Sequence, residues 1–391
     1  MKQSIKSLAS EYAPDLIACR HHLHSHPELS FQEYETSKFI QSKLDEYGIP
    51  YTAGLAGTGI VALIKGKNPD KKVIALRADI DALPIEEAND VPYKSQNPGI
   101  MHACGHDVHT TVVLGAARIL QQIRDEFEGT IKILFQPGEE KHPGGASLMI
   151  RDGALENPKP QAILGLHVLP AMETGILGFR GGQYMASADE IYITVKSKGG
   201  HAAAPHLTAD TILIASNLVV SLQQIISRNN DPFSPSVLSI CAFNGGFTTN
   251  VIPSEVKLMG TFRAMDETWR FRAHELIRKQ ATELVHAMGA EIDIDILVGY
   301  PTLYNNENVT ATARSLAEDY LGKENVTDTE LRMGAEDFAY YSQVIPACFF
   351  RLGTGNKARG ISAGVHTPVF DIDERALEIG AGTMAYLAAR F

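Results

Sequence analysis

Metal-binding side chains are concentrated in four short segments of this chain. The densest one reads Met-His-Ala-Cys-Gly-His-Asp-Val-His at 101–109. The others are Gln-Pro-Gly-Glu-Glu at 136–140, Gly-Leu-His-Val at 165–168 and Gly-Val-His-Thr-Pro at 364–368. Thiolate, imidazole and carboxylate groups are the side chains that bind divalent transition metals. The pattern predicts a shared metal site with the ligands Cys104, His106, Glu140, His167 and His366.

Cys104 and His106 supply too few ligands for two metal ions by themselves. The whole set fits two ions about 3.5–4 Å apart that share a bridging thiolate or water. A site with two metal ions is typical of a hydrolase, and such an enzyme also needs a base that takes a proton from metal-bound water. Glu139 is the candidate, because neighbouring side chains in a loop diverge, so that Glu140 can bind metal while Glu139 faces the water. By itself the acidic pair is typical of a solvated turn, but its place after Gln-Pro-Gly and a buried strand favours the catalytic interpretation.

Carboxylates are expected behind the metal-bound histidines, since such imidazoles usually donate their other N–H to a carboxylate. Asp79 and Asp81 end a predicted strand and are candidates for that place, Asp81 above all. An Asx turn with no metal role is the alternative. Capping and packing explain His102 and His109 as well as chemistry does. A separate run is interpreted as structural, because Leu and Pro interrupt it where a helix ends; it comprises His21, His22, His24 and His26.

An α/β scaffold is predicted to position these groups. Short apolar runs that are typical of strands alternate with helical stretches, and these runs lie at 72–77, 130–135 and 162–166. Asp79, Glu139 and His167 each come at or just beyond the C-terminal end of such a strand. Open α/β sheets bind ligands at that edge, which supports a common site.

Two helices are predicted beside these strands. Ser-Phe-Gln-Glu at 30–33 has the form of a capping box that begins a helix running to about Tyr47. Apolar residues at helical spacing predict a second helix from Thr110 to Phe127.

The pattern of predicted strands and helices changes around Gly181-Gly182, and the α/β pattern returns after Gly299–Pro301. Between these crossings the pattern predicts strand, helix, two strands, helix and strand, which is the ferredoxin-like order. The strands are expected at 190–197, 236–243, 254–264 and 291–298, with a turn at 244–246 between the middle two, and the helices at 208–228 and 267–288. Beyond the second crossing a strand at 347–352 precedes His366. We predict a small domain, 184–300, inserted into a larger one formed by 1–183 and 301–391.

Composition excludes several classes of protein. A chain of 391 residues exceeds one ordinary core, which agrees with two domains. The net charge of -11 argues against a nucleic-acid partner and gives no reason to expect an anionic membrane as partner. No run approaches the roughly 18 apolar residues of a membrane span, and the N-terminus shows no signal core. The four cysteines are scattered, so a reducing cytoplasm is expected, with Cys19, Cys241 and Cys348 as core residues.

The chain resembles the M20 metallopeptidase family, in the amidohydrolase branch of aminoacylases, hippurate hydrolases, N-acetyldiaminopimelate deacetylases and auxin-conjugate hydrolases. The resemblance extends over the whole length. Its motifs in the first half are His-Pro-Glu-Leu-Ser at 26–30, Arg-Ala-Asp-Ile-Asp-Ala-Leu-Pro at 77–84 and the segments at 101–107 and 136–140. In the second half they are Gly-Gly-His-Ala-Ala-Ala-Pro at 199–205, Asn-Val-Ile-Pro at 250–253, Gly-Ala-Glu-Asp-Phe at 334–338 and His-Thr-Pro at 366–368. Gly138 is a mild departure, since the family often has Ala or Ser there.

The resemblance implies an α/β fold in which a zinc-peptidase-like catalytic domain carries an inserted ferredoxin-like α+β dimerisation (lid) domain. It implies two divalent metal ions per subunit on the five ligands named above, with Cys104 where many relatives have a bridging Asp. The ions would be zinc, manganese, nickel or cobalt. Glu139 would be the base, and His201 would stabilise the oxyanion in the partner subunit's active site. Asn250 and Arg263 would lie near the substrate carboxylate, and Glu336 would stand with Asp79 and Asp81 behind the ligands.

The expected reaction is hydrolysis of an N-acyl-amino acid to a carboxylic acid and a free amino acid. Dipeptidase or metallocarboxypeptidase action is the alternative, since a peptide is also an N-acyl-amino acid. A non-catalytic binding protein would be expected to lack Glu139 or a ligand, and none is missing. The expected partners are this small-molecule substrate and a second copy of the chain, in a homodimer or homotetramer.

Overall fold

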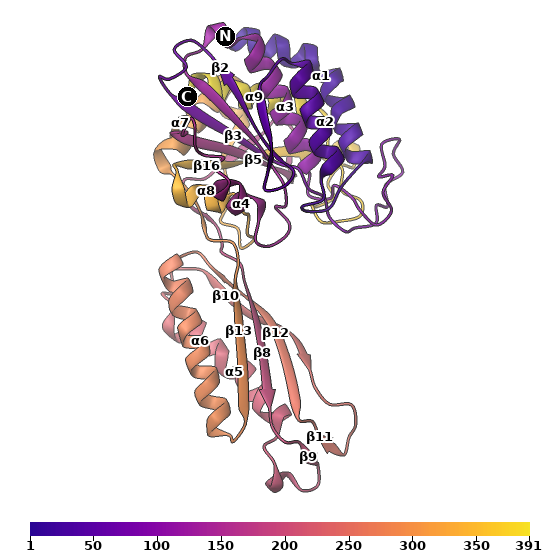
Figure 1. Ribbon diagram of the computed structural model, residues 1–391, viewed down its shortest axis with the longest axis vertical. Helices are drawn as coiled ribbons and strands as arrows, with labels where there is room; N and C mark the ends of the chain where they lie inside the picture. Colours follow the sequence, from indigo (N-terminus) through magenta and orange to yellow (C-terminus); the bar gives the residue numbers. More distant parts are fainter. The chain divides into compact units, whose positions relative to one another are not determined.

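The computed structural model describes all 391 residues, which divide into two compact units (Figure 1). The first unit comprises Met1–Gly182, Tyr304–Glu330 and Asp337–Phe391. The second comprises Gln183–Leu303 together with the short segment Leu331–Glu336. The sequence did not indicate that this later segment belongs to the second unit. Two short strands, Gly182–Met185 (β7) and Leu303–Asn305 (β14), occur where the chain passes from one unit to the other.

The first unit is built on an eight-stranded sheet in the order β1-β2-β4-β3-β5-β16-β6-β15. Its central strands β4, β3, β5 and β16 are parallel. All residues of β3, β4 and β16 are buried, as apolar strands covered on both faces should be. The strands are Tyr51–Leu55 (β1), Gly59–Lys65 (β2), Val73–Asp79 (β3), Thr130–Gln136 (β4), Ala162–Glu173 (β5), Leu177–Phe179 (β6), Val326–Asp328 (β15) and Ala347–Gly355 (β16). The predicted strands are confirmed.

Helix α3 packs against both α1 and α9, which also contact each other. Gly115 permits the close approach, because a Cβ there would be 2.8 Å from both Leu16 and Ala381. The helices are Lys2–Ser25 (α1), Tyr34–Glu46 (α2), His106–Gln122 (α3), Gly145–Arg151 (α4), Glu307–Leu321 (α7), Ala339–Val344 (α8) and Arg375–Arg390 (α9). None of the helices in the chain combines the length and apolarity that crossing a membrane requires.

The predicted capping box before α2 is wrong. The N-cap of α2 is Glu33, and it makes no side-chain cap hydrogen bond. Ser30 Oγ instead donates to Asp81 Oδ2 at 2.6 Å, so a tertiary contact takes the hydroxyl that local capping would have used. Helix α3 also begins at His106, earlier than predicted, which places part of the Cys/His segment on the helix itself.

The second unit is a four-stranded antiparallel sheet in the order β10-β12-β8-β13. Helices α5 and α6 run beside one another along one face of it (Figure 1). This strand order is that of a ferredoxin-like fold and confirms the prediction. The elements are Asp189–Lys196 (β8), Thr211–Asn229 (α5), Ser236–Asn244 (β10), Glu255–Ala264 (β12), Glu267–Ala287 (α6) and Glu291–Val298 (β13).

Two details of the second unit differ from expectation. The predicted turn at 244–246 begins a longer excursion, in which Val251–Ile252 (β11) pairs with Gly200–His201 (β9). Cys241 is exposed and so is not a core residue, because β10 lies at the edge of the sheet and this side chain faces solvent. Cys19 and Cys348 are buried, as predicted.

Candidate metal centre

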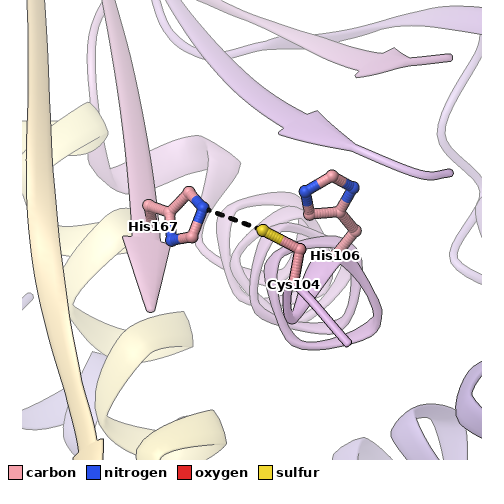
Figure 2. Close-up of side chains that lie close together, drawn as sticks. All are labelled: Cys104, His106 and His167. Carbon is pink, nitrogen blue, oxygen red and sulfur yellow. Dashed lines mark hydrogen bonds between the residues drawn. The ribbon is translucent and has the colours of Figure 1, made fainter. Parts of the chain in front are cut away.

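The N-terminus of α3 and the middle of β5 bring three of the predicted ligands together. Figure 2 shows Cys104 and His106 at the start of the helix and His167 on the strand, with the Cys104 sulfur directed toward His167. Gly105 makes this approach possible, since its φ is 86° and a Cβ there would lie 2.6 Å from a Val168 methyl. The glycine therefore lets the Cys104–His106 turn lie against β5.

All five predicted ligands converge. Cys104 Sγ lies 3.4 Å from His167 Nε2 and 3.3 Å from His366 Nε2. His366 Nε2 is also 3.2 Å from Glu140 Oε1. The same carboxylate oxygen lies 4.0 Å from His106 Nε2. Imidazole, thiolate and carboxylate donors thus surround one small volume, with the thiolate between two histidines.

The hydrogen bonds behind the cluster fix which ring nitrogen faces it. His106 Nδ1 lies 3.2 Å from Asp81 Oδ1 and His167 Nδ1 lies 2.8 Å from the Val168 carbonyl oxygen, so both rings donate at Nδ1. Each ring then presents the lone pair of Nε2 to the cluster. His106 Nε2 is buried and has no hydrogen-bond partner. A cation would satisfy this atom, which is the ordinary expectation for a buried polar group.

Protons and metal ions compete for this cluster. The hydrogen bonds that the protonated His366 ring donates to Cys104 and Glu140 raise the pKa of His366 to about 10. Burial, with Glu140 beside it, raises the pKa of the Cys104 thiol. Burial opposes a charge on His106, but Asp79, Cys104 and Asp81 outweigh it and raise its pKa. Since divalent cations bind the deprotonated forms, metal binding would release these protons. The donor set fits a divalent transition metal.

His167 is the neutral member of the set. Burial, and then the charge of Arg351, hold the pKa of this histidine well below its usual value. Neutral imidazole is the form that binds metal.

His109 is close to the cluster but is no ligand. Its Nδ1 lies 2.6 Å from Asp79 Oδ1, and its Nε2 accepts the N–H of Val168 at 3.0 Å. Both ring nitrogens are therefore used. Asp79 in turn accepts from Arg77 at 2.7 Å and, through its carbonyl, from the Thr110 hydroxyl at 2.9 Å. This places Asp79 behind the cluster, where it holds β3 against α3.

Asp81 connects three parts of the site. Its two oxygens accept the His106 ring N–H, the Ser30 hydroxyl at 2.6 Å and the Glu140 N–H at 3.0 Å. Burial opposes the charge, but the hydrogen bond from His106 and its charge lead the effects that lower the pKa of Asp81. The side chain orients one predicted ligand and the backbone of another.

Glu139 and Glu140 both reach the cluster from the loop after β4. Glu139 Oε2 lies 3.9 Å from His106 Nε2, and Glu139 Oε1 accepts the Asp337 N–H at 3.4 Å. Only 7% of Glu139 is exposed. One of its oxygens is thus held by the backbone while the other faces the donors of the cluster.

A buried ion network that the sequence did not reveal supports the start of α3. Arg20 Nε donates to Asp107 Oδ2 at 2.9 Å, and His24 Nδ1 is 2.7 Å from the same oxygen. His24 Nε2 is 3.1 Å from Glu87, so His24 is structural, as interpreted from the sequence. Burial opposes the charge on Asp107, but Arg20 and His24 outweigh it and lower its pKa. The sequence did contain one indication that Arg20 is buried, because it follows Leu16 by four residues and so lies on the same, buried face of α1.

Four predicted site residues belong to the second unit, and their relation to the cluster stays a prediction. His201 is exposed on β9 and pairs with Val251. Asn250 is exposed beside it, and its carbonyl oxygen accepts the Ala202 N–H at 3.0 Å. Arg263 lies on β12, where its Nε donates to Thr261 Oγ1 at 3.2 Å. Glu336 is buried and ends the segment Leu331–Glu336.

Comparison with known proteins assigns the family. Residues 75–390 match peptidase family M20/M25/M40. An IAA-amino acid hydrolase of Arabidopsis thaliana is 39% identical over 383 residues, which cover 96% of this chain and 86% of that protein. N-acetyl-L-cysteine deacetylase of Bacillus subtilis is 40% identical over 375 residues, covering 96% of this chain and 87% of that protein.

Solved structures agree with this assignment. A dinuclear metal binding peptidase of the M20 family from Bacillus subtilis superimposes with a TM-score of 0.85 at 35% identity, covering 97% of this chain and 98% of that one. The similarity confirms the predicted fold class, an α/β catalytic domain with an inserted lid domain. The chain therefore belongs to peptidase family M20/M25/M40 and is a metal-dependent hydrolase of its amidohydrolase group.

Proposed function

We propose that this enzyme hydrolyses N-acyl-amino acids to a carboxylic acid and a free amino acid, with two divalent metal ions on Cys104, His106, Glu140, His167 and His366. The relatives that are named for hydrolysis of an amino-acid conjugate and for deacetylation of an N-acetyl amino acid support this substrate class. The observation that carries the proposal is the convergence of these five donors beside Glu139 Oε2, which lies 3.9 Å from His106 Nε2. When bound, the ions would polarise the amide carbonyl and lower the pKa of a water molecule.

Cys104 would contribute its sulfur to the set of residues that holds the ions. Its sulfur lies 3.4 Å from His167 Nε2 on one side and 3.3 Å from His366 Nε2 on the other. A thiolate is a soft ligand that favours zinc over the hard cations, while the imidazole and carboxylate donors of the same set are also compatible with manganese, nickel or cobalt.

Glu139 acts as the general base in this proposal. It takes the proton from the nucleophilic water and passes it to the leaving nitrogen. The hydrogen bond that the Asp337 N–H donates at 3.4 Å fixes one oxygen, so the other keeps its direction toward the water. Asp81 and Asp79 orient His106 and the start of α3 relative to this base, and Glu336 would support the ligands in the same way.

The second unit would supply substrate recognition from a partner subunit. In this arrangement 1–183 and 301–391 form the catalytic domain and 184–300 the dimerisation domain. The partner subunit's His201 would donate to the oxyanion, and Asn250 and the permanently charged Arg263 would bind the substrate carboxylate. Exposed apolar side chains support a contact surface on this unit, namely Val237 and Phe243 on edge strand β10 and Leu213 and Val220 on α5. The expected assembly is a homodimer.

The expected location is the cytoplasm. None of the four cysteines forms a disulfide, and Cys241 is an exposed free thiol. A reducing compartment keeps such thiols reduced.

A panel of substrates tests the proposed reaction. Acetyl- and benzoyl-amino acids and dipeptides would be assayed on enzyme loaded with zinc, manganese, nickel or cobalt in turn. We expect a higher kcat/KM for the acyl-amino acids than for any dipeptide. Preference for dipeptides would favour peptidase action, the second candidate, which the description of the solved relative as a peptidase supports. Turnover of neither class would overturn the proposal.

A further inference from the structure

We propose that Glu33 is a positioning residue for Glu139, acting through the backbone amide of Gly138. This inference rests on the proposed role of Glu139 as general base. Glu33 lies in the turn between α1 and α2, far from the metal-binding segments in sequence. No contact between Glu33 and the ligands is needed, because its carboxylate reaches the loop that carries the base.

The carboxylate of Glu33 is fully buried and is held by three neutral donors. Its Oε1 accepts the N–H of Phe31 at 2.8 Å and the N–H of Gly138 at 2.9 Å. Its Oε2 accepts the Thr58 hydroxyl at 2.7 Å. One oxygen therefore connects the turn before α2 directly to the loop after β4.

Both backbone polar groups of Gly138 make hydrogen bonds. Its N–H donates to Glu33, and its carbonyl oxygen accepts the Gly145 N–H at 3.1 Å. Its φ is 59°, and a Cβ at this position would lie 2.4 Å from the Phe31 ring. Since Gly138 immediately precedes Glu139, these contacts set the direction in which the Glu139 side chain leaves the backbone.

The energetics of Glu33 depend on the hydrogen bonds that its buried carboxylate accepts. A buried carboxylate without a cationic partner is costly unless hydrogen bonds offset its desolvation. Burial, and then the charge of Asp81, raise the pKa of Glu33 to about 7. A purely apolar side chain would avoid the burial of a carboxylate, but it would leave the Phe31 and Gly138 N–H groups and the Thr58 hydroxyl without this acceptor. What the carboxylate contributes is the fixed direction of the Gly138 amide.

The same turn supports the metal ligands by a separate route. Ser30 Oγ donates to Asp81, which holds the His106 ring and the Glu140 N–H. Loss of the Ser30 hydroxyl should therefore affect metal affinity. Loss of the Glu33 carboxylate should affect the rate of the chemical step, so the two routes give different readouts.

The test compares Glu33→Ala with Glu33→Gln, measuring kcat, KM, metal content by elemental analysis and unfolding in urea. For Glu33→Ala we expect kcat to fall at least tenfold, with KM within twofold and metal content unchanged. Glu33→Gln should keep kcat within about threefold, because its amide oxygen can accept both N–H groups and its amide nitrogen can donate to Thr58. Full kcat in Glu33→Ala, or a Gln variant as slow as the Ala variant, would overturn the proposal.

Ser37→Ala is the matched control. Its hydroxyl donates to the Thr58 carbonyl at 2.7 Å, in the same neighbourhood, but does not contact the Gly138 loop. We expect unchanged kcat in this variant. An equal loss of kcat in Ser37→Ala would mean that general destabilisation, and not positioning, explains the Glu33 result. If Glu33→Ala does not fold, Glu33→Met serves instead, since its side chain has a similar length but no strong acceptor for the Gly138 N–H; full kcat there would overturn the proposal.

A double variant separates this inference from the proposed function. If Glu33 acts through Glu139, adding Glu33→Ala to Glu139→Ala should cause no further loss of rate. A further tenfold loss in the double variant would overturn the positioning role alone. Normal activity in Glu139→Ala would instead overturn the assignment of the base.

Discussion

The sulfur of Cys104 lies 3.4 Å from Nε2 of His167, although 63 residues separate the two in the chain. The helix α3 and the strand β5 produce this contact, one by its N-terminus and the other by its central residues. Gly105 allows the two elements to meet. The pair is the centre of the cluster, because His366 approaches the same sulfur at 3.3 Å.

Replacement of Cys104 should remove metal before it affects anything else. In Cys104→Ala both flanking histidines lose their shared neighbour, so elemental analysis should find less than half of the wild-type metal and activity should fall in parallel. Cys241→Ser is the control, since that thiol is exposed in the second unit. Full metal occupancy in Cys104→Ala, with only a kinetic defect, would count against Cys104 as a ligand.

Replacement of Glu139 should lower kcat without lowering the metal content. Glu139→Ala removes the proton carrier but no proposed ligand, so metal content should stay at the wild-type level. General acid–base catalysis contributes on the order of 10²–10⁴-fold to the rate, so kcat should fall by a factor of that order. Loss of metal together with loss of activity would show that Glu139 is a ligand.

The five converging donors could be predicted from the sequence because their identities restrict their chemistry. Cys, His and Glu side chains from four separate segments have few reasons to gather other than a cation, and the structure does bring them together, although His167 lies in the middle of β5 and not at the end of a strand as predicted. The ferredoxin-like unit was predictable for a different reason. Its strands alternate buried and exposed residues, as β8 does, so local periodicity records the fold.

Contacts between distant segments could not be predicted in the same way. Ser30 and Glu33 have the spacing of a capping box, yet one side chain binds Asp81 and the other binds Gly138. Arg20 finds its partners Asp107 and Asp371 at separations of 87 and 351 residues. Local sequence cannot distinguish a capping hydroxyl from one that a distant carboxylate will accept.

The pH dependence of stability should report His102. This histidine is 1% exposed, and burial lowers its pKa to about 4. The folded state therefore resists protonation, while the unfolded chain takes up a proton near pH 6.5. Stability should be fully present above about pH 6.5 and should decrease by up to about 3 kcal/mol as pH falls toward 4.

Urea unfolding at several pH values checks this prediction. His102→Gln cannot titrate, so the stability difference between the variant and the wild type should shift in the variant's favour as pH falls from 6.5 to 4. A difference that stays constant over this range would show that His102 is not the group responsible.

His201 tests the assembly that the proposed function requires. The residue is exposed on β9, and its Nδ1 accepts the Ala203 N–H at 3.0 Å, which leaves Nε2 as the ring nitrogen that can donate. If it donates to the oxyanion in the partner subunit, His201→Ala should lower kcat by on the order of 10²–10³. Metal content and the dimeric mass in sedimentation should not change. A loop histidine with only a structural role would leave kcat near the wild-type value.

Mixed dimers decide whether the residue acts across the interface. Neither His201→Ala nor Glu139→Ala should be active alone. In a heterodimer of the two, one active site has an intact Glu139 and receives the partner subunit's His201, while the other site lacks both. Random exchange makes half of the dimers heterodimers, so about a quarter of wild-type activity should return. If heterodimers are shown to form by mass but no activity returns, His201 does not act in the partner's site, and the proposed oxyanion donor must be sought within the same subunit.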